Sequence, residues 1–195
     1  LDVTRVISGK VLLSRQPLNL AALVHRAVDT LRLTGEAARH LIDVDLEEAW
    51  VEADATRMEQ VVSNLVGNAL KYTPPGSEIA ISLRCEGEQA VMRVSDNGDG
   101  IPADLLPRIF DLFVQGERTI DRRAGGLGIG LTLVKRLIDL HGGNVTAHSS
   151  LAGSRFEVRL PLVDAVAEAP ARRWQAQGAG RRVLVIEDNE DALAS

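Results

Sequence analysis

The chain has 195 residues, of which 45% are hydrophobic and 25% charged, a balance typical of a globular protein with room for one ordinary domain and additional segments. Its formal net charge of −5 argues against general nucleic-acid binding, so we expect no nucleic-acid partner. The single cysteine, Cys85, excludes an intrachain disulfide, and no apolar run has the length or flanks of a membrane span or a signal peptide.

The first part of the chain is predicted to alternate short strands with helices. Pro17 breaks the pattern, and Asn19 can cap the helix that follows, because its side chain can accept a backbone N–H. Asp54 can cap a further helix, which a Pro-Pro-Gly turn at residues 74–76 ends. The expected elements are a helix end over 1–10, a strand over 11–13, helices over 20–40 and 55–72, and a strand over 41–46.

The second part is predicted to hold two hairpins separated by helices and a polar loop. Pro102 can open a short helix, and the glycines at 142–143 can end a longer one. The expected elements are strands over 78–85 and 90–95, a short helix over 101–110, a loop over 111–126, a helix over 128–141, and strands over 144–149 and 155–160 that turn at residues 152–153.

One stripe of the helix over 55–72 is polar. Gln60, Asn64, Asn68 and Lys71 follow one another at steps of four, four and three, which places them on one side of the helix. An amide oxygen can complete the octahedral shell of Mg²⁺ while phosphates supply the negative ligands, and a lysine can neutralise a phosphate. A solvent-facing polar stripe explains the same spacing, so other segments must decide between the two interpretations.

Two glycine-containing segments, residues 96–101 and 125–131, predict an adenine nucleotide pocket. Asp96 follows an apolar strand, and its carboxylate can accept a hydrogen bond from an exocyclic amine. The glycines after it let the backbone approach a base or a phosphate closely. The second segment opens a helix, whose N-terminus can hold anionic oxygens. Both segments favour the ligand-binding interpretation of the polar stripe.

Together these motifs resemble, in family order, the catalytic ATP-binding domain of sensor histidine kinases. The resemblance spans residues 17–161 and rests on an asparagine box at 64–74, a first glycine box at 96–101, a phenylalanine box at 109–113, a second glycine box at 126–131 and a terminal Gly-Ser-Arg-Phe at 153–156. It implies the Bergerat-type fold of the GHKL superfamily, which DNA gyrase, a heat-shock chaperone and a mismatch-repair ATPase share. We therefore expect a two-layer α/β sandwich whose mixed, largely antiparallel sheet is covered by helices on one face.

The resemblance also implies ATP and Mg²⁺ as ligands and assigns roles to residues. Asp96 would accept from the adenine amine, Asn68 would ligate Mg²⁺, and Asn64 and Lys71 would be the catalytic residues beside the phosphates. The further expected nucleotide contacts are Tyr72, Gly98, Gly100, Ile101, Phe113, Gly126, Leu127, Gly128, Ile129, Gly130, Leu131 and Ser154. The loop over 111–126 would form a lid. Its arginines, Arg118, Arg122 and Arg123, are either phosphate contacts or a solvent-facing basic loop.

The flanking segments resemble the neighbours of this domain in a hybrid kinase, so we expect a piece of a longer, homodimeric parent. The expected division is the end of a dimerising stem at 1–10, the ATP-binding domain at 11–162, a linker at 163–181 and the start of a receiver at 182–195. Residues 8–10 would form a hinge, and Glu187-Asp188 an acidic Mg²⁺ pair, although a buried strand ending in an acidic turn has the same pattern. The expected partners are the phosphoacceptor histidine of the stem and a response-regulator receiver. We expect a cytoplasmic location, whether or not the parent is membrane-anchored.

None of the chain's four histidines has the acidic neighbour that follows the family's phosphoacceptor, so we expect that acceptor outside this chain. Hydrolytic relatives of the fold carry a water-activating glutamate at the position of Asn64, and an amide is a poor general base. The resemblance therefore implies slow ATP hydrolysis, with transfer of the γ-phosphoryl group to a supplied histidine.

Five other interpretations are weaker. A P-loop needs a lysine where Leu131 stands, and a Rossmann site needs a strand before the second glycine segment, which follows a polar loop. A hydrolytic ATPase of the same fold conflicts with Asn64. A nucleotide-binding scaffold without catalysis is the alternative from a different class. An anti-sigma-type serine kinase shares the pocket but not the flanking segments.

Overall fold

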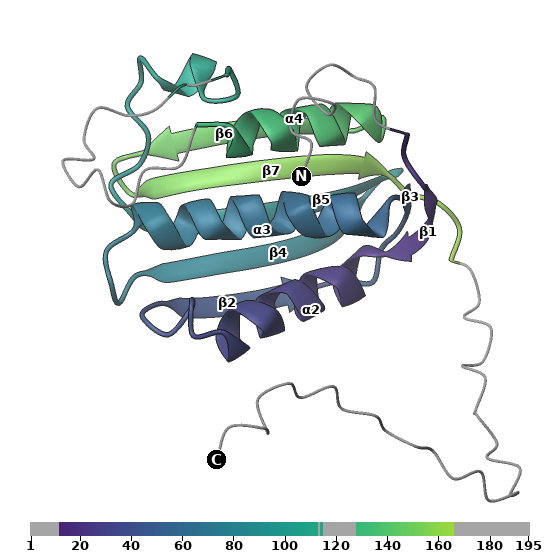
Figure 1. The fold of residues 1–195 in the computed structure, drawn as a ribbon, viewed down its shortest axis with the longest axis horizontal. Helices are drawn as coiled ribbons and strands as arrows, with labels where there is room; N and C mark the ends of the chain where they lie inside the picture. The colour runs from purple at the N-terminus through teal and green to yellow at the C-terminus, as the bar shows by residue number, and fades with distance from the viewer. Residues whose placement is uncertain (1–11, 113, 115–127, 166–195) are drawn as a thin grey trace, which may run out of the picture.

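The structure, a computed structural model, describes residues 12–112, 114 and 128–165. Within these residues, five strands form one sheet in the order β2-β4-β5-β7-β6, and three helices cross one face of it (Figure 1). The elements of this main body are α2 (Leu20–Leu33), β2 (Leu41–Leu46), α3 (Ala55–Tyr72), β4 (Glu78–Glu86), β5 (Gln89–Asp96), the 3-10 helix η1 (Leu106–Arg108), α4 (Gly130–Leu140), β6 (Asn144–Ser150) and β7 (Gly153–Pro161).

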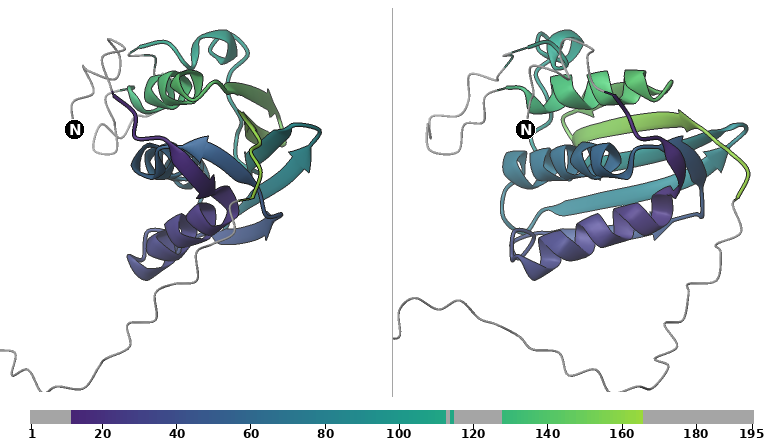
Figure 2. Two further views of the ribbon diagram at one scale, coloured as in Figure 1. Left: turned by 90° about the vertical axis from the view of Figure 1, so that its right-hand side faces the viewer. Right: turned by 45° about the vertical axis from the view of Figure 1, so that its right-hand side comes forward.

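The main sheet is mixed. β2 runs parallel to β4, whereas the pairs β4-β5, β5-β7 and β7-β6 are antiparallel. Alternate residues of β4, Ile79, Ile81 and Leu83, are buried beneath the helices, as the period of two in a strand requires. Seen from the side, the helices α2, α3 and α4 lie on the same side of the sheet (Figure 2). The expected two-layer α/β sandwich is therefore confirmed.

Capping side chains and buried apolar stripes stabilise the expected helices α2 and α3. Asn19 accepts the N–H of Ala22 at 3.1 Å and so caps α2. In α3, the apolar residues recur at helical spacing, and Leu65 and Val66 are 0% exposed. Burial of this stripe against the sheet leaves the polar stripe of α3 on another side of the helix.

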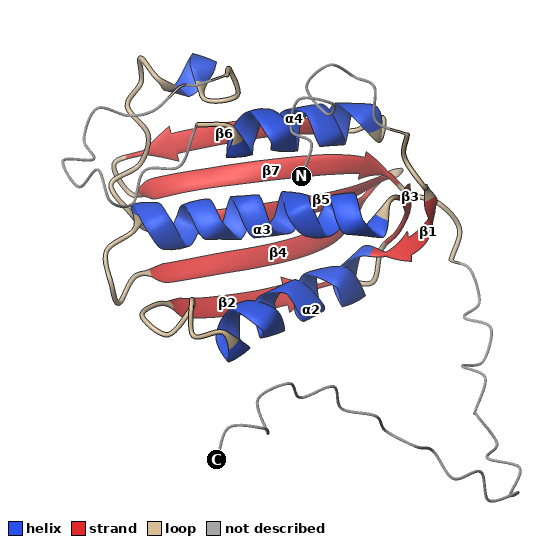
Figure 3. Cartoon of the chain, viewed as in Figure 1, coloured by secondary structure: helices blue, strands red, loops and turns tan. Residues whose placement is uncertain are grey.

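A small second sheet lies at one end of the main sheet (Figure 3). It pairs β1 (Gln16–Asn19) antiparallel with β3 (Trp50–Ala53), and Leu162 bridges to Val51. The expected strand at 11–13 and break at Pro17 are wrong, because the strand itself contains Pro17. Proline is tolerated there because β1 is an edge strand of the described sheet, where a missing N–H costs no ladder bond. β3 was not expected at all.

Some expected helices are shorter in the structure. α2 ends at Leu33 and not near residue 40, because Thr34 caps it and Gly35 adopts a left-handed φ of 78°. Residues 101–110 form turns around η1 and not one α-helix, since Pro107 has no N–H to continue an i→i−4 ladder. α4 begins at Gly130, two residues later than expected.

The incoming chain is tied to the ends of α3 and α4. The Ser14 N–H donates to Asp54 Oδ2 at 3.1 Å, and the Arg15 guanidinium donates to the carbonyl of Leu140. His141 joins the two helices at the same place. Its Nδ1–H donates to Leu137 O at 2.7 Å, and its Nε2 accepts the N–H of Asp54 at 3.1 Å.

The flanking segments are outside the described residues, apart from the first part of the linker at 163–165. The expected stem at 1–10, its hinge at 8–10 and the receiver-like segment at 182–195 therefore stay predictions. Among the helices that the structure does describe, none has both the length and the apolar character needed to cross a membrane.

Candidate nucleotide-binding site

Asp96 ends β5 with its carboxylate held by three hydrogen bonds. Oδ1 accepts the N–H of Gly98 at 3.0 Å and the N–H of Ser154 at 3.3 Å, and Oδ2 accepts the hydroxyl of Ser154. Ser154 belongs to β7, the strand next to β5. These donors fix the orientation of the carboxylate. Its remaining lone pairs can still accept from an external amine.

The turn after Asp96, residues 97–101 and called the glycine turn below, is fitted between α3 and β6. A β-carbon at Gly98 would lie 2.7 Å from Thr73 Cγ2, and one at Gly100 would lie 2.3 Å from the Ser150 carbonyl oxygen. Gly100 also has a left-handed φ of 73°. Glycine at these two positions therefore lets the turn pack closely against Thr73 and Ser150 beside Asp96.

Ile101 closes the glycine turn, and its side chain packs partly buried against the core. Two hydroxyl residues that the sequence analysis did not single out hold this region. Ser149 Oγ accepts the N–H of Ile101 at 2.6 Å, and Thr73 Oγ1 donates to Ala69 O at 2.7 Å. Thr73 lies inside the asparagine box, but nothing in the sequence marks Ser149.

Asn64, in the polar stripe of α3, lies beside the start of α4. Asn64 Nδ2 donates to Gln60 O at 2.7 Å, and Asn64 Oδ1 would lie only 2.8 Å from a β-carbon at Gly130. Asn68 is half-buried one turn further along α3. The structure thus places Asn64 beside the N-terminus of α4, where backbone N–H groups favour an anion.

Lys71 does not join the asparagines in this structure. Its Nζ lies 4.9 Å from the ring centroid of Tyr72, within cation–π range, and both side chains are exposed. An exposed lysine on a flexible stem can still reach a phosphate. Lys71 and Tyr72 therefore lie at the margin of the site.

The second glycine segment is described only from Gly128 onward. Gly128 has φ 69°, Ile129 precedes α4, and Gly130 begins it without a side-chain cap from the described residues. Leu131 packs partly buried on the core. Of the other expected contacts, Phe113, Gly126 and Leu127 lie outside the described residues, as do the lid arginines Arg118, Arg122 and Arg123.

A magnesium ion fits the donors that are present. Within the described part of the chain, no three acidic, histidine or cysteine side chains are grouped as a metal site. Asn68 would instead supply one neutral oxygen, and a polyphosphate would supply the negative ones. Mg²⁺ is commonly held by few protein ligands together with substrate phosphates.

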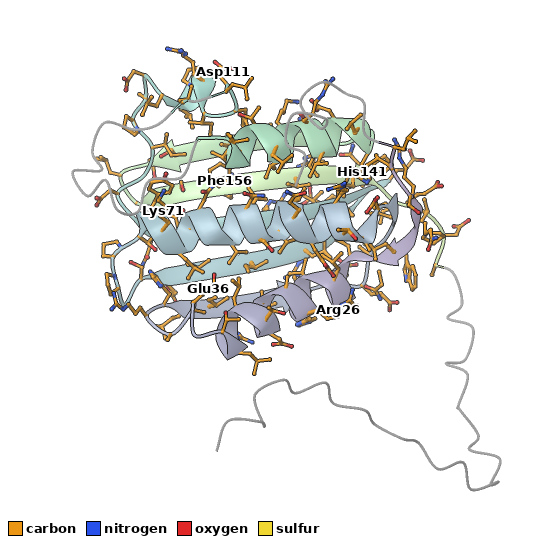
Figure 4. All side chains as sticks on the ribbon, in the orientation of Figure 1. Arg26, Glu36, Lys71, Asp111, His141 and Phe156 are labelled. Carbon is orange, nitrogen blue, oxygen red and sulfur yellow. The ribbon has the colours of Figure 1, made fainter. Side chains whose placement is uncertain are left out.

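These groups gather at one end of the helical layer. Lys71 and Asp111 lie toward that end, and His141 lies at the other (Figure 4). A groove of about 220 Å³ beside Ser14 and Asp54 is not part of this site. Both carboxylate oxygens of Asp54 accept backbone N–H groups, from Arg57 and Ser14, which indicates a structural role there.

The four histidines are not grouped at the nucleotide end. His25 and His148 are exposed, and His141 is buried between α3 and α4. His40 Nε2 lies 3.3 Å from the Thr73 carbonyl oxygen and so packs under the end of α3. Each position agrees with a structural or surface histidine.

Comparison with known proteins gives a family match over most of this region. The family described as histidine kinase-, DNA gyrase B- and HSP90-like ATPase matches residues 53–164. That range contains the asparagine stripe, Asp96, both glycine segments and Ser154.

Individual sensor kinases are similar over most of this chain. It is 36% identical over 160 residues to the probable sensor histidine kinase TcrY of Mycobacterium tuberculosis. The aligned region covers 82% of this chain and 34% of TcrY. It is 32% identical over 200 residues to the circadian input-output histidine kinase CikA of Synechococcus elongatus. That aligned region covers 98% of this chain and 26% of CikA. The chain thus spans about a third or less of these relatives.

A solved structure shares the fold. Full-length ShkA in complex with AMPPNP superimposes with a TM-score of 0.72 at 25% identity, over 85% of this chain and 35% of that one. The nucleotide analogue in that complex is a property of ShkA.

Proposed function

Because this chain belongs to the family of histidine kinase-, DNA gyrase B- and HSP90-like ATPases, as the catalytic ATP-binding domain of a two-component sensor histidine kinase, we propose that it binds ATP at Asp96 and transfers the γ-phosphoryl group to a histidine outside this chain. The observation that carries the proposal is the carboxylate of Asp96, which the Gly98 N–H and Ser154 hold in one orientation beside the glycine turn.

Recognition of the base follows from the hydrogen-bonding pattern of Asp96. Adenine carries an exocyclic amine that donates, whereas guanine carries a carbonyl oxygen at the corresponding position, which a carboxylate would repel. Ser154 and the Gly98 N–H prevent the carboxylate from rotating away. We therefore expect ATP to be preferred over GTP.

The phosphates would lie between the α3 asparagines and the N-terminus of α4. Asn64 and Asn68 offer amide groups, α4 offers backbone N–H groups, and Lys71 can leave Tyr72 to place its charge on a phosphate. Asn68 would hold Mg²⁺, which when bound offsets the phosphate charge. In this arrangement the protein contributes positioning and electrostatics, and an imidazole nitrogen supplied by a partner attacks the γ-phosphorus as the bond to ADP breaks.

The parent protein is proposed from the sequence of the flanks. Residues 1–10 would end a dimerising stem that carries the acceptor histidine, 163–181 would be a linker, and 182–195 would begin a receiver. The match to CikA over 98% of this chain extends into both flanks and supports a kinase context for them. We propose a cytoplasmic location for this domain, where ATP is supplied.

Calorimetric titration of ATP, with and without Mg²⁺, tests the proposal. The chain should bind ATP, and Asp96→Asn should weaken binding at least tenfold, because its amide replaces an acceptor with a donor toward the adenine amine. Asp104→Asn, an exposed carboxylate close in sequence, is the matched control and should bind like the unaltered chain.

Three results would contradict the proposal. An unaltered chain that binds no ATP would favour the scaffold interpretation. ATP binding that is indifferent to Asp96→Asn would place the pocket elsewhere. Rapid ATP turnover without an acceptor would favour a hydrolytic ATPase of the same fold.

A further inference from the structure

We propose that Ser149 is a positioning residue that holds the glycine turn against the adenine pocket from β6. The inference rests on the proposed function, since it concerns the same pocket. Neither the asparagine box nor the glycine boxes contain Ser149. Its assignment comes from the strand pairing and the contacts around the turn.

The first observation is the contact between Ser149 and the second half of the turn. The N–H of Ile101 donates to Ser149 Oγ at 2.6 Å. A β-carbon at Gly100 would lie 2.8 Å from the same oxygen, so the hydroxyl and the turn backbone are in close contact. Ser149 is half-buried, and it lies on the same face of β6 as the buried Val145, four residues earlier.

The second observation is the register of β6 and β7. Ser149 lies directly opposite Ser154, the residue that holds the Asp96 carboxylate. One pair of opposite residues in the sheet, Ser149 and Ser154, therefore carries two hydroxyls that hold different ends of the turn. Ser154 fixes the residue before the turn, and Ser149 fixes the residue that ends it.

The third observation is that different side chains hold the two halves of the turn. Asn97 anchors the near half, because its Oδ1 accepts the N–H of Glu78 at 2.9 Å. Gly98 is packed against Thr73. Beyond Gly98, the left-handed Gly100 has no side chain of its own, and the hydroxyl of Ser149 is the partner of the next N–H. Without that hydroxyl, the Ile101 N–H would lose this hydrogen bond, and we expect the end of the turn to be held less firmly.

The groups proposed for the phosphates lie elsewhere, on α3 and α4. Loss of the Ser149 hydroxyl should therefore weaken recognition of the base more than binding of the phosphates. This distinction separates a positioning role from general support of the fold, which would affect every nucleotide equally.

The test compares Ser149→Ala, Ser149→Thr and Ser150→Ala in the full chain. Calorimetry gives the Kd for Mg-ATP and Mg-GTP, thermal unfolding gives the Tm, and NMR hydrogen exchange follows the Ile101 amide. Ser150→Ala is the matched control, because that hydroxyl accepts the N–H of Ala152 in the hairpin turn at 3.1 Å and not one from the glycine turn.

Ser149→Ala should weaken ATP binding about three- to tenfold, the scale of one hydrogen bond, and narrow the preference for ATP over GTP. Its Ile101 amide should exchange faster, while the Tm stays close to that of Ser150→Ala. Ser149→Thr, which keeps the hydroxyl, should restore both binding and protection.

Three outcomes would overturn the inference. They are an unchanged Kd and unchanged Ile101 exchange in Ser149→Ala, an equal loss for ATP and GTP that accompanies a lowered Tm, and a Ser149→Thr variant as weak as Ser149→Ala. If the unaltered chain binds no ATP, the proposed function itself fails; if it binds ATP but ignores Ser149, only this inference fails.

Discussion

His141 has both ring nitrogens engaged. Its Nδ1–H donates to Leu137 O and its Nε2 accepts the Asp54 N–H, so the neutral tautomer is the one that fits. Burial of the imidazole lowers the pKa of His141 below its ordinary value, and the nearby Arg15 acts in the same direction. The Leu137 carbonyl and Asp54 oppose this shift. Protonation would place an N–H where the Asp54 N–H already points.

The free energy of unfolding should therefore decrease as the pH is lowered below about 6.5, the ordinary pKa of histidine. In that window the unfolded chain binds a proton at His141 more readily than the folded chain, so the free energy of unfolding rises with pH. Urea unfolding at pH 7.5, 6.5 and 5.5 measures the slope, which one group limits to about 1.4 kcal/mol per pH unit. His141→Gln should reduce the slope, whereas His148→Gln, at an exposed position, should keep it. Equal slopes in all three proteins would contradict this account.

Site residues differ in how visible they are in sequence. Asp96, Asn64 and Asn68 stand out because a carboxylate before glycines and amides at helical spacing are chemically unusual. Ser149 does not, because its role depends on Ile101, which lies 48 positions away and meets it only through strand pairing. Lys71 was expected near the phosphates, and the structure places its Nζ over the ring of Tyr72.

Elements were predictable where their own residues carry the pattern. α3 has an apolar stripe and a cap, and β4 alternates, so each was recognised with nearly its observed bounds. β1 and β3 are four residues long and exist because they pair with each other, a tertiary effect that no local pattern carries. The end of α2 was misplaced because Thr34 and Gly35 stop the helix before its favourable composition ends.

At the scale of an element, the cap of α3 should matter more than the cap of α2. Asp54 accepts two backbone N–H groups, from Arg57 and from Ser14 of the incoming chain, whereas Asn19 accepts one, from Ala22. Asp54→Ala should lower the free energy of unfolding by about 2 kcal/mol, and Asn19→Ala by about 1 kcal/mol. Urea denaturation of both variants measures this order, and the reverse order would show that the Ser14 contact adds nothing.

Across the whole molecule, the nucleotide groups and the incoming chain lie at opposite ends of the helical layer (Figure 4). α3 and α4 both run between them, from Asp54 toward Lys71 and from Gly130 to Leu140. The incoming chain is already fixed at Ser14 and Arg15. The described chain is therefore tied to the domain from Ser14 onward.

The isolated chain should hydrolyse ATP slowly, because no carboxylate occupies the place of Asn64 to activate water. We expect turnover well below the roughly 1 s⁻¹ at the low end of ordinary enzymes. Release of labelled phosphate from ATP measures it, and addition of a separately produced stem with its histidine should move the label onto protein. Fast turnover with no stem present would contradict the prediction.

Val51, in β3, pairs with a different segment of the chain on each side of the strand. Leu18, on the way into the domain, pairs with it in β1, and Leu162, on the way out, bridges to it from the other side. Two strand spacings separate these neighbours, about 10 Å. A domain whose two ends lie this close together can be inserted into a surface loop of another protein without distorting that protein. It can also be circularly permuted with a short connector.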